Sequence, residues 1–206
     1  MDIAIHTNAN QPHQVKQAEI FRKGFLKHNI KANVTTSVQQ EADVHVVLGP
    51  NYAKANWINH DRVILLDRNF YNSYLDHVSI GWMNKNGGRD YKVGAGRKAL
   101  IIREPHGTKS LFLADYNGIT EPADIVRLHP CNETHKSTLQ HDINQCNRAI
   151  GYNSTALVEA ALCGLEITCK GKNSILTNDN WLELLPYANW HYNEIESGEV
   201  WEHLQS

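Results

Sequence analysis

Short apolar segments alternate with helical stretches along most of this chain of 206 residues. The apolar segments are rich in β-branched residues and bounded by turn residues, as buried parallel strands are. Between the first two, residues 12–29 carry an apolar stripe at helical spacing. The alternation predicts an α/β fold with parallel sheets. The expected strands are residues 2–7, 31–36, 43–49, 62–67, 77–82, 98–104, 124–130, 148–153 and 166–171.

A glycine-rich basic segment, residues 84–98, interrupts this alternation with four glycines and no long apolar run. It predicts a linker or an exposed loop between two small Rossmann-like halves, residues 1–90 and 91–206, with a cleft between them. The basic side chains would either line that cleft for an anion or belong to a solvated loop. They are Lys85, Arg89, Lys92, Arg97 and Lys98. The tryptophan-rich tail from residue 181 should be helical on either side of Pro186.

Composition excludes several classes of protein. The formal net charge is −2 and the pI is near 6.6, so no global basic field points to a nucleic-acid partner, although a local patch remains open. No apolar run approaches the ~18–20 residues of a membrane span. Residues 1–14 lack the basic start and apolar run of a signal peptide, so a cytoplasmic protein is expected.

A group of cysteines and histidines between residues 131 and 146 offers four possible zinc ligands. The spacing fits no common zinc module, which favours a polar loop and helix instead. No metal site is therefore expected. The four residues are Cys131, His135, His141 and Cys146.

The stretch "AIGYNSTALVEAALCGLEITC" (149–169) contains a strand, an abrupt polar turn, an apolar helix and a second strand. Asn153, Ser154 and Thr155 open the helix. Ligands of open α/β sheets bind at the carboxyl ends of strands, where helix N–H groups and the positive dipole end attract anions such as phosphate. Simple N-capping by Asn153 or Ser154 explains the same residues. Glu159, one turn into the helix, would accept hydrogen bonds from ribose hydroxyls or be a dipole-favoured surface acid.

The expected strand 124–130 ends in Arg-Leu-His-Pro, and Pro130 stops the strand there. His129 should therefore stand at the same sheet edge as Ser154. An imidazole at that place can donate to a phosphate or a base carbonyl, although a lone histidine usually has a structural role.

"RLHP" (127–130) and "RAIGYNSTALVEAALCGLEITC" (148–169) together resemble the donor-binding half of GT-B glycosyltransferases, closest to the capsule-type and Kdo-type transferases. They are also similar to sugar-nucleotide epimerases of that architecture. The resemblance covers roughly residues 124–170 and implies a reduced GT-B fold, with residues 1–90 as a shortened acceptor half. It implies that His129, Ser154 and Thr155 hold a nucleotide and its phosphate, and that Glu159 holds ribose. The chain departs from the family in its short length and in Leu165-Glu166, where a Lys-Pro pair is common.

The resemblance implies metal-independent transfer of a sugar from a CMP- or UDP-sugar to an acceptor carbohydrate or a modified nucleic acid. The nucleotide sugar is a co-substrate, and no separate cofactor is implied. Residues 103–110 follow the expected strand 98–104, the first of the second half, and so should reach the same sheet edge. Arg103, Lys109 or Arg127 would add positive charge there, near the leaving phosphate. The base that activates the acceptor should come from the first half, where His6 and Asp67 end apolar strands, although both positions also suit structural roles.

Two alternatives remain open at this point. One is a non-catalytic protein that binds a nucleotide or nucleotide sugar, which the lack of a base in the first half would favour. The other is a phage-type transferase that modifies DNA bases, which a basic cleft lined by residues 84–98 would favour.

Overall fold

The chain divides into two compact units in the computed structural model. The first comprises Met1–Asn69, Ser73–Arg97 and Pro186–Ser206, and the second comprises Phe70–Asn72 and Lys98–Leu185. The expected division at residue 90 assigned the whole C-terminal tail to the second half, whereas residues from Pro186 onward belong to the first unit. The structure describes residues 1–68, 77–94, 97, 102–115, 117–130, 132, 134–152, 154–172 and 174–206.

The first unit is built on a mixed sheet with the strand order β11-β5-β4-β3-β1-β2, and β6 pairs with β5. The four strands β1 to β4 are parallel, while β5, β6 and β11 run antiparallel to their neighbours. The strands are β1 (Ile3–His6), β2 (Ala32–Thr35), β3 (Val44–Leu48), β4 (Val63–Arg68), β5 (His77–Met83), β6 (Arg89–Asp90) and β11 (Asn189–His191).

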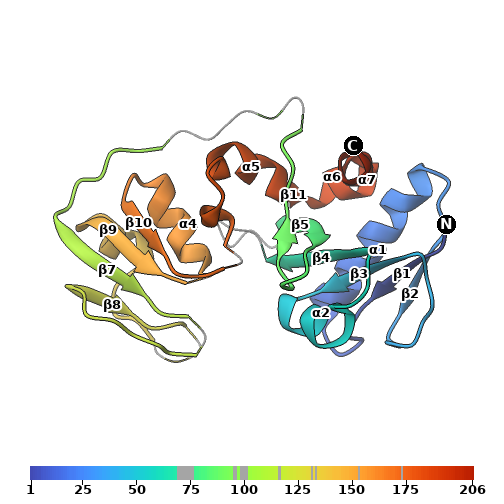
Figure 1. Ribbon diagram of the computed structural model, residues 1–206, viewed down its shortest axis with the longest axis horizontal. Coiled ribbons are helices and arrows are strands. Elements are labelled where there is room, and N and C mark those ends of the chain that lie inside the picture. Colours follow the sequence, from blue (N-terminus) through green and yellow to red (C-terminus); the bar gives the residue numbers. More distant parts are fainter. Residues whose placement is uncertain are drawn as a thin grey trace. The chain divides into compact units, whose positions relative to one another are not determined.

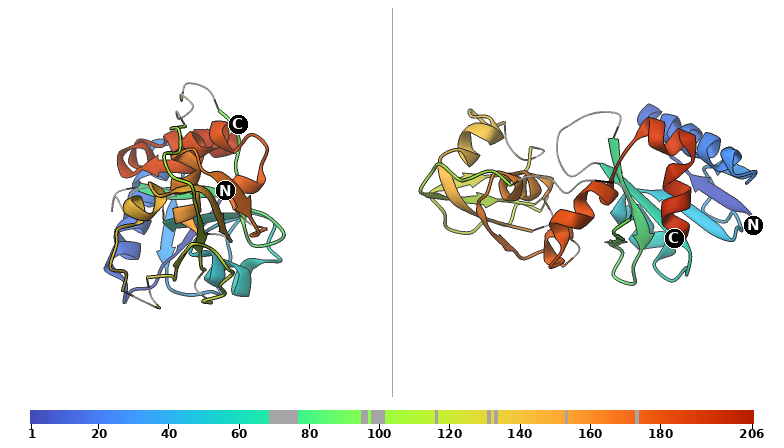
Figure 2. Two further views of the ribbon diagram at one scale, coloured as in Figure 1. Left: turned by 90° about the vertical axis from the view of Figure 1, so that its left-hand side faces the viewer. Right: turned by 90° about the horizontal axis from the view of Figure 1, so that it is seen from above.

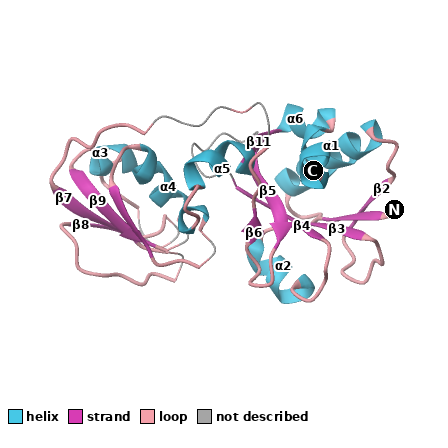
Figure 3. Cartoon of the chain, turned by 45° about the horizontal axis from the view of Figure 1, so that its top comes forward, coloured by secondary structure: helices cyan, strands magenta, loops and turns pink. Residues whose placement is uncertain are grey.

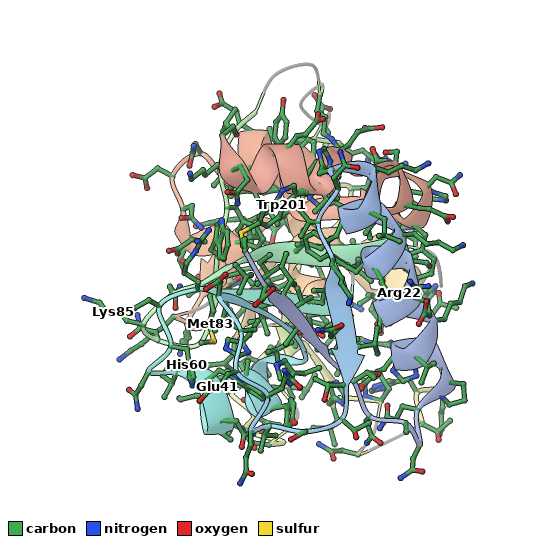
Figure 4. The ribbon with its side chains drawn as sticks, turned by 90° about the vertical axis from the view of Figure 1, so that its right-hand side faces the viewer. Arg22, Glu41, His60, Met83, Lys85 and Trp201 are labelled. Carbon is green, nitrogen blue, oxygen red and sulfur yellow. The ribbon has the colours of Figure 1, made fainter. Side chains whose placement is uncertain are left out.

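Helices cover both faces of this sheet, so β3 is buried on both sides, as are all five of its residues. Helix α1 (Pro12–Lys27) lies on one face with α6 (Tyr192–Ser197) and α7 (Glu199–Gln205), as Figures 1 and 2 show. Helix α2 (Pro50–Trp57) lies on the other. Figure 4 shows His60 and Met83 on the α2 side of the sheet and Trp201 on the opposite side, among the C-terminal helices.

The C-terminal residues join the first unit because they complete both its sheet and its core. Strand β11 extends the sheet at β5, with Trp190 opposite Val78. The indole of Trp201 packs edge-on against Phe25 of α1, with 5.1 Å between ring centroids. The tail is helical on either side of Pro186, as expected. This residue lies inside α5 (Trp181–Ala188), and the break comes at β11.

The second unit contains a parallel four-stranded sheet with the order β10-β9-β7-β8. Helices α3 and α4 lie on the same face of this sheet (Figure 3). The connection from β7 to β8, residues 114–124, has no helix among its described residues. The elements are β7 (Lys109–Leu113), β8 (Ile125–Arg127), α3 (Leu139–Ile143), β9 (Cys146–Gly151), α4 (Thr155–Leu162) and β10 (Glu166–Cys169).

One expected strand is wrong in its position. Residues 102–104 form no strand, and residues 98–101 lie outside the described part of the chain. The first strand of this unit is β7 instead, because its residues pair with β8 and β9 on either side and bury Leu111 and Phe112 completely. Residues 102–108 therefore precede β7 and stand at its amino end.

The protein is thus an α/β protein with one mixed and one parallel sheet, compatible with a Rossmann-like fold. The parallel strands have the same order in both units: β2-β1-β3-β4 in the first and β8-β7-β9-β10 in the second. In the first unit β2 lies on one side of β1, and β3 and β4 lie on the other, so the strand order switches sides between β1 and β3. In the second unit it switches sides in the same way between β7 and β9. In open α/β sheets, ligands bind at such switch points, beyond the carboxyl ends of the strands.

Candidate functional site

The switch point of the second unit brings the polar turn of residues 152–155 to the carboxyl end of β9. Ser154 is the N-cap of α4, and its hydroxyl accepts a hydrogen bond of 3.2 Å from the Ala156 amide. Thr155, the first helical residue, is exposed. Asn153 lies outside the described residues. Ser154 therefore has the capping role that the sequence allowed, at a place where the positive end of the helix dipole faces the sheet edge.

His129 and Glu159 belong to the same part of the second unit. His129 is half-buried just beyond β8, where its carbonyl accepts from the Asn132 amide and closes a turn. Because β7 separates β8 from β9, the ends of these two strands are about 10 Å apart at the same edge. Glu159 is half-buried on α4, about one and a half turns from Ser154. The parallel sheet puts His129 and Ser154 at the same edge, as expected, whereas Glu159 lies farther along α4.

Arg103 does not join this group. Its amide donates to the carbonyl of Leu162, at the far end of α4 from Ser154, and α4 is about 12 Å long. Gly164 packs there so closely that a Cβ would lie 1.9 Å from the Arg103 carbonyl oxygen. The expected role of Arg103 near the phosphate is wrong for this geometry, because it depended on a strand at residues 98–104.

The two other cations considered for the site also have different roles. Lys109 begins β7 and so stands at the amino edge, where its Nζ donates to the Gln145 side chain across 2.8 Å. The Arg127 guanidinium pairs with the buried carboxylate of Asp142 and donates to the Ser137 carbonyl. Arg127 therefore ties the end of β8 to α3.

Two of the possible zinc ligands, His135 and Cys146, have other surroundings. Nε2 of His135 lies 2.7 Å from the Leu128 carbonyl, and Cys146 is buried at the start of β9, where desolvation raises the pKa of its thiol. Cys131 lies outside the described residues. Among the residues that the structure describes, no group of three or more histidine, cysteine or carboxylate side chains has a metal-binding arrangement.

His6, a candidate base, ends β1 as expected, but its side chain is buried, with only 1% of the residue exposed. Its Nδ1 lies 3.1 Å from the Ser37 carbonyl and its Nε2 lies 2.9 Å from Nδ1 of His45. Burial, and then the charge of His45, lower its pKa to about 4. An imidazole enclosed in this way does not meet an acceptor hydroxyl.

Asp67, the other candidate base, is the next-to-last residue of β4, and its side chain is one-third exposed. It lies opposite Ser79 of β5, which in turn lies opposite Asn189 of β11, so the three side chains share the α2 face in one row. The Arg89 guanidinium approaches the Asp67 carboxylate to 3.5 Å. Arg89 also donates from Nε to the Tyr91 hydroxyl across 2.6 Å. Asp67 is thus held in a polar cluster at the edge of the first unit's sheet.

Two members of the basic segment 84–98 have roles inside the first unit. Arg89 lies in β6, and although burial opposes its charged form, Tyr91 and Asp67 raise its pKa. Arg97 stacks on Trp190, with 3.9 Å from the guanidinium carbon to the ring centroid, and pairs with Glu194. The expectation that these two cations line an anion-binding cleft is therefore wrong.

Sequence reasoning missed a further contact at the carboxyl edge of the second unit. Lys170 directly follows β10, and its Nζ donates to both carboxylate oxygens of Glu121 in the β7–β8 connection. The sequence did offer one indication of this contact, because Lys170 stands at the end of the expected strand 166–171. Its partner is 49 residues away, beyond the reach of local spacing.

No protein-family model matches the chain, and no curated protein matches it either. Within the described residues, no helix has both the length and the apolar character that a membrane span requires.

Proposed function

We propose that the second unit binds the nucleotide of a nucleotide-activated sugar at the start of α4, and that the protein is a glycosyltransferase-like enzyme. The observation that carries the proposal is the position of Ser154 and Thr155. They open a helix at the switch point between β7 and β9, where parallel sheets bind ligands.

This arrangement suits the chemistry of glycosyl transfer. Negative charge grows on the nucleotide phosphate as the bond to the sugar breaks. Amide groups at the start of α4, the hydroxyls of Ser154 and Thr155 and the imidazole of His129 would stabilise that charge without a metal ion. Glu159 would accept hydrogen bonds from ribose hydroxyls. The acceptor is a carbohydrate or a modified nucleic acid. It is bound by residues other than the four that contact the nucleotide.

Calorimetric titration with CMP, UDP, GDP and their sugars tests nucleotide binding. The variant Ser154→Asp separates a phosphate site from a helix cap, because aspartate caps a helix as well as serine does but repels a phosphate. We expect this variant to keep its thermal stability and to bind nucleotide at least about tenfold more weakly. Unchanged affinity would mean that Ser154 only caps α4. Ser154→Ala with Thr155→Ala should weaken binding by about 1–3 kcal/mol.

A non-catalytic nucleotide-binding protein is the second candidate, and the state of the two candidate bases favours it. His6 is enclosed and Asp67 is paired with Arg89. If Asp67 is the base, Asp67→Asn should leave nucleotide affinity unchanged and lower turnover by about 10²–10⁴. Tight nucleotide binding without hydrolysis or transfer of any nucleotide sugar, across a panel of sugar and nucleic-acid acceptors, would support the binding protein instead.

A further inference from the structure

The sheet of the first unit ends in an edge strand. Strand β2 is the last in the strand order, and among the described strands it pairs with β1 alone (Figure 1). Thr7 donates its amide to the carbonyl of Thr35 across 3.0 Å, and Thr35 is paired with His6. The backbone groups of successive residues in a strand point to opposite sides of it. The N–H and C=O groups of Ala32 and Val34 therefore point away from β1, toward the open edge.

A groove lies at this edge, between β2 and helix α1. It is open, with a volume of about 680 Å³, and it is lined by Arg22, Leu26, Asn29 and residues 31–34. Leu26 is 49% exposed, so an apolar side chain stands uncovered beside the edge of the strand. An extended segment paired with β2 would lie about 4.8 Å beyond it, inside this groove.

The two faces of β2 differ in what they would offer to such a segment. Ala32 and Val34 pack on the core beneath α1. Because side chains alternate across a strand, Lys31 and Asn33 face the other way. An added strand would therefore have Val34 and Leu26 as neighbours on the α1 face. On the opposite face it would lie beside Lys31, which is exposed and has no ion pair with any described residue.

The charges of the groove are positive. Arg22 and Lys31 are the ionisable side chains among the described residues that line it, and Arg22 pairs with Glu19 on the exposed surface of α1. A lysine beside a short edge strand opposes indiscriminate pairing with other strands. It favours a strand that brings a carboxylate, because unlike charges on neighbouring strands attract and like charges repel.

We propose that the edge of β2 and the groove beside α1 bind an extended segment of a partner protein, in which apolar and acidic residues alternate. Main-chain hydrogen bonds to Ala32 and Val34 hold the segment, in the way that sheet edges elsewhere take up a peptide strand. Its apolar side chains pack on Leu26 and Val34, and its carboxylates face Lys31. The site lies wholly within the first unit and does not depend on the nucleotide site proposed for the second.

Fluorescence polarisation with a short labelled peptide of alternating valine and glutamate tests this proposal. Lys31→Glu should weaken binding about threefold to tenfold at low ionic strength, and less at high ionic strength. Leu26→Ser should weaken it to a similar extent, because apolar contact is lost. Both residues are exposed, so both variants should keep the thermal stability of the unmodified protein. Undiminished binding of the peptide by both variants would overturn the proposal.

Two controls match the charge change. Lys85→Glu alters an exposed lysine of the first unit that Figure 4 shows well apart from Arg22, and it should leave the affinity nearly unchanged. A peptide of alternating valine and lysine should bind the unmodified protein more weakly than the glutamate peptide does, and should bind Lys31→Glu more tightly. Equal binding of both peptides to the unmodified protein would remove the acidic partner.

Two N-methylated forms of the glutamate peptide test the main-chain contacts. Methyl groups on the valine amides block one edge of the extended peptide, and methyl groups on the glutamate amides block the other. We expect one form to lose binding and the other to keep it, because a single edge of an added strand faces β2. Equal behaviour of the two forms would show that the peptide does not bind as a strand.

A second copy of this chain is the alternative occupant of the edge. Analytical ultracentrifugation at increasing protein concentration distinguishes the two. The unmodified protein and Lys31→Glu should sediment alike if the edge takes a partner segment. Self-association that Lys31→Glu abolishes, without binding of the glutamate peptide, would overturn the proposal and assign the edge of β2 to a dimer.

Discussion

His45 donates a hydrogen bond from Nδ1 to Nε2 of His6 inside the first unit. The direction follows from the other ring nitrogen of His6, which lies 3.1 Å from the Ser37 carbonyl. A carbonyl only accepts, so Nδ1 of His6 carries the proton and Nε2 is the acceptor. His45 must then supply the proton of the 2.9 Å contact. Both rings are buried, and Trp57 covers His6 with 4.5 Å between ring centroids. The hydrogen bond therefore requires Nε2 of His6 to be unprotonated.

This pair should make the first unit sensitive to acid. Burial, followed by the charge of His45, lowers the pKa of His6 to about 4. The unfolded chain binds the proton near pH 6.5, so between these values the unfolded state holds more protons and stability falls as pH falls. The loss begins below about pH 6.5, is complete below about pH 4, and amounts to at most about 3 kcal/mol for His6.

Urea unfolding at pH 7.5, 6 and 5 measures this slope. His6→Leu should be less stable than the unmodified protein at pH 7.5 but should show a flatter dependence on pH. The control is His13→Gln, at an exposed histidine in the first turn of α1. This variant should keep the pH dependence of the unmodified protein. An unaltered slope in His6→Leu would assign the acid sensitivity to other groups.

The sequence predicts the α/β class and most strands of the first unit, because segments such as residues 43–49 are apolar throughout and become strands buried on both faces. It does not predict which apolar segment begins the second unit's sheet. Residues 98–104 and 109–113 have similar strand-forming composition, and only pairing with β8 and β9 distinguishes them.

The candidate site likewise has residues that local sequence patterns identify and contacts that they do not. Ser154 could be found because an N-cap is a local signal, a hydroxyl directly before an apolar helix. Arg103 was misplaced because its assignment depended on the wrong strand. The contacts of His6 with His45 and of Glu121 with Lys170 join residues 39 and 49 positions apart, so only the folded sheet brings them together.

Gly24 tests how the C-terminal helices attach to α1. A Cβ at Gly24 would lie 2.0 Å from the carbonyl oxygen of Ile195 in α6. In an isolated helix, glycine to alanine is favourable by about 1 kcal/mol. Here we expect Gly24→Ala to lower the free energy of unfolding by about 2 kcal/mol, because the backbones must separate. Lys23→Ala, at an exposed neighbour, should be nearly neutral in the same denaturation experiment. A stabilised Gly24→Ala would show that α6 does not pack on Gly24.

Removal of metal ions should leave nucleotide binding unchanged. The proposed phosphate partners are amide, hydroxyl and imidazole groups, which need no cation between them and a phosphate. Dialysis against a chelator, followed by titration with UDP or CMP, should give the same affinity before and after. Elemental analysis of the purified protein is the complementary measurement. Stoichiometric zinc would contradict the prediction and direct attention to His135, His141 and Cys146.

Arg89 should be the most costly charge to remove in the first unit. Its side chain is 11% exposed, and it joins Asp67 to the Tyr91 hydroxyl. Arg89→Met leaves the Asp67 carboxylate and the Tyr91 hydroxyl without their guanidinium partner. Because Asp67 is one-third exposed, we expect a loss smaller than the about 3–5 kcal/mol of a fully buried pair. Chemical unfolding measures the loss. Arg22→Met is the matched control, because Arg22 pairs with Glu19 on the exposed face of α1 and should cost less than about 0.5 kcal/mol.

The double variant Asp67→Asn with Arg89→Met shows how much of that loss belongs to the pair. If Arg89 mainly neutralises Asp67, the second change should recover part of the stability, since no unpaired carboxylate then remains. If Arg89 mainly positions Tyr91 against Ser79, whose hydroxyls are 3.1 Å apart, the double variant should be no more stable than Arg89→Met. The first result would keep Asp67, a carboxylate near the end of β4 that Arg89 neutralises, as a candidate base. The second would make the cluster a structural brace between β5 and β6, and would withdraw Asp67 as a candidate base.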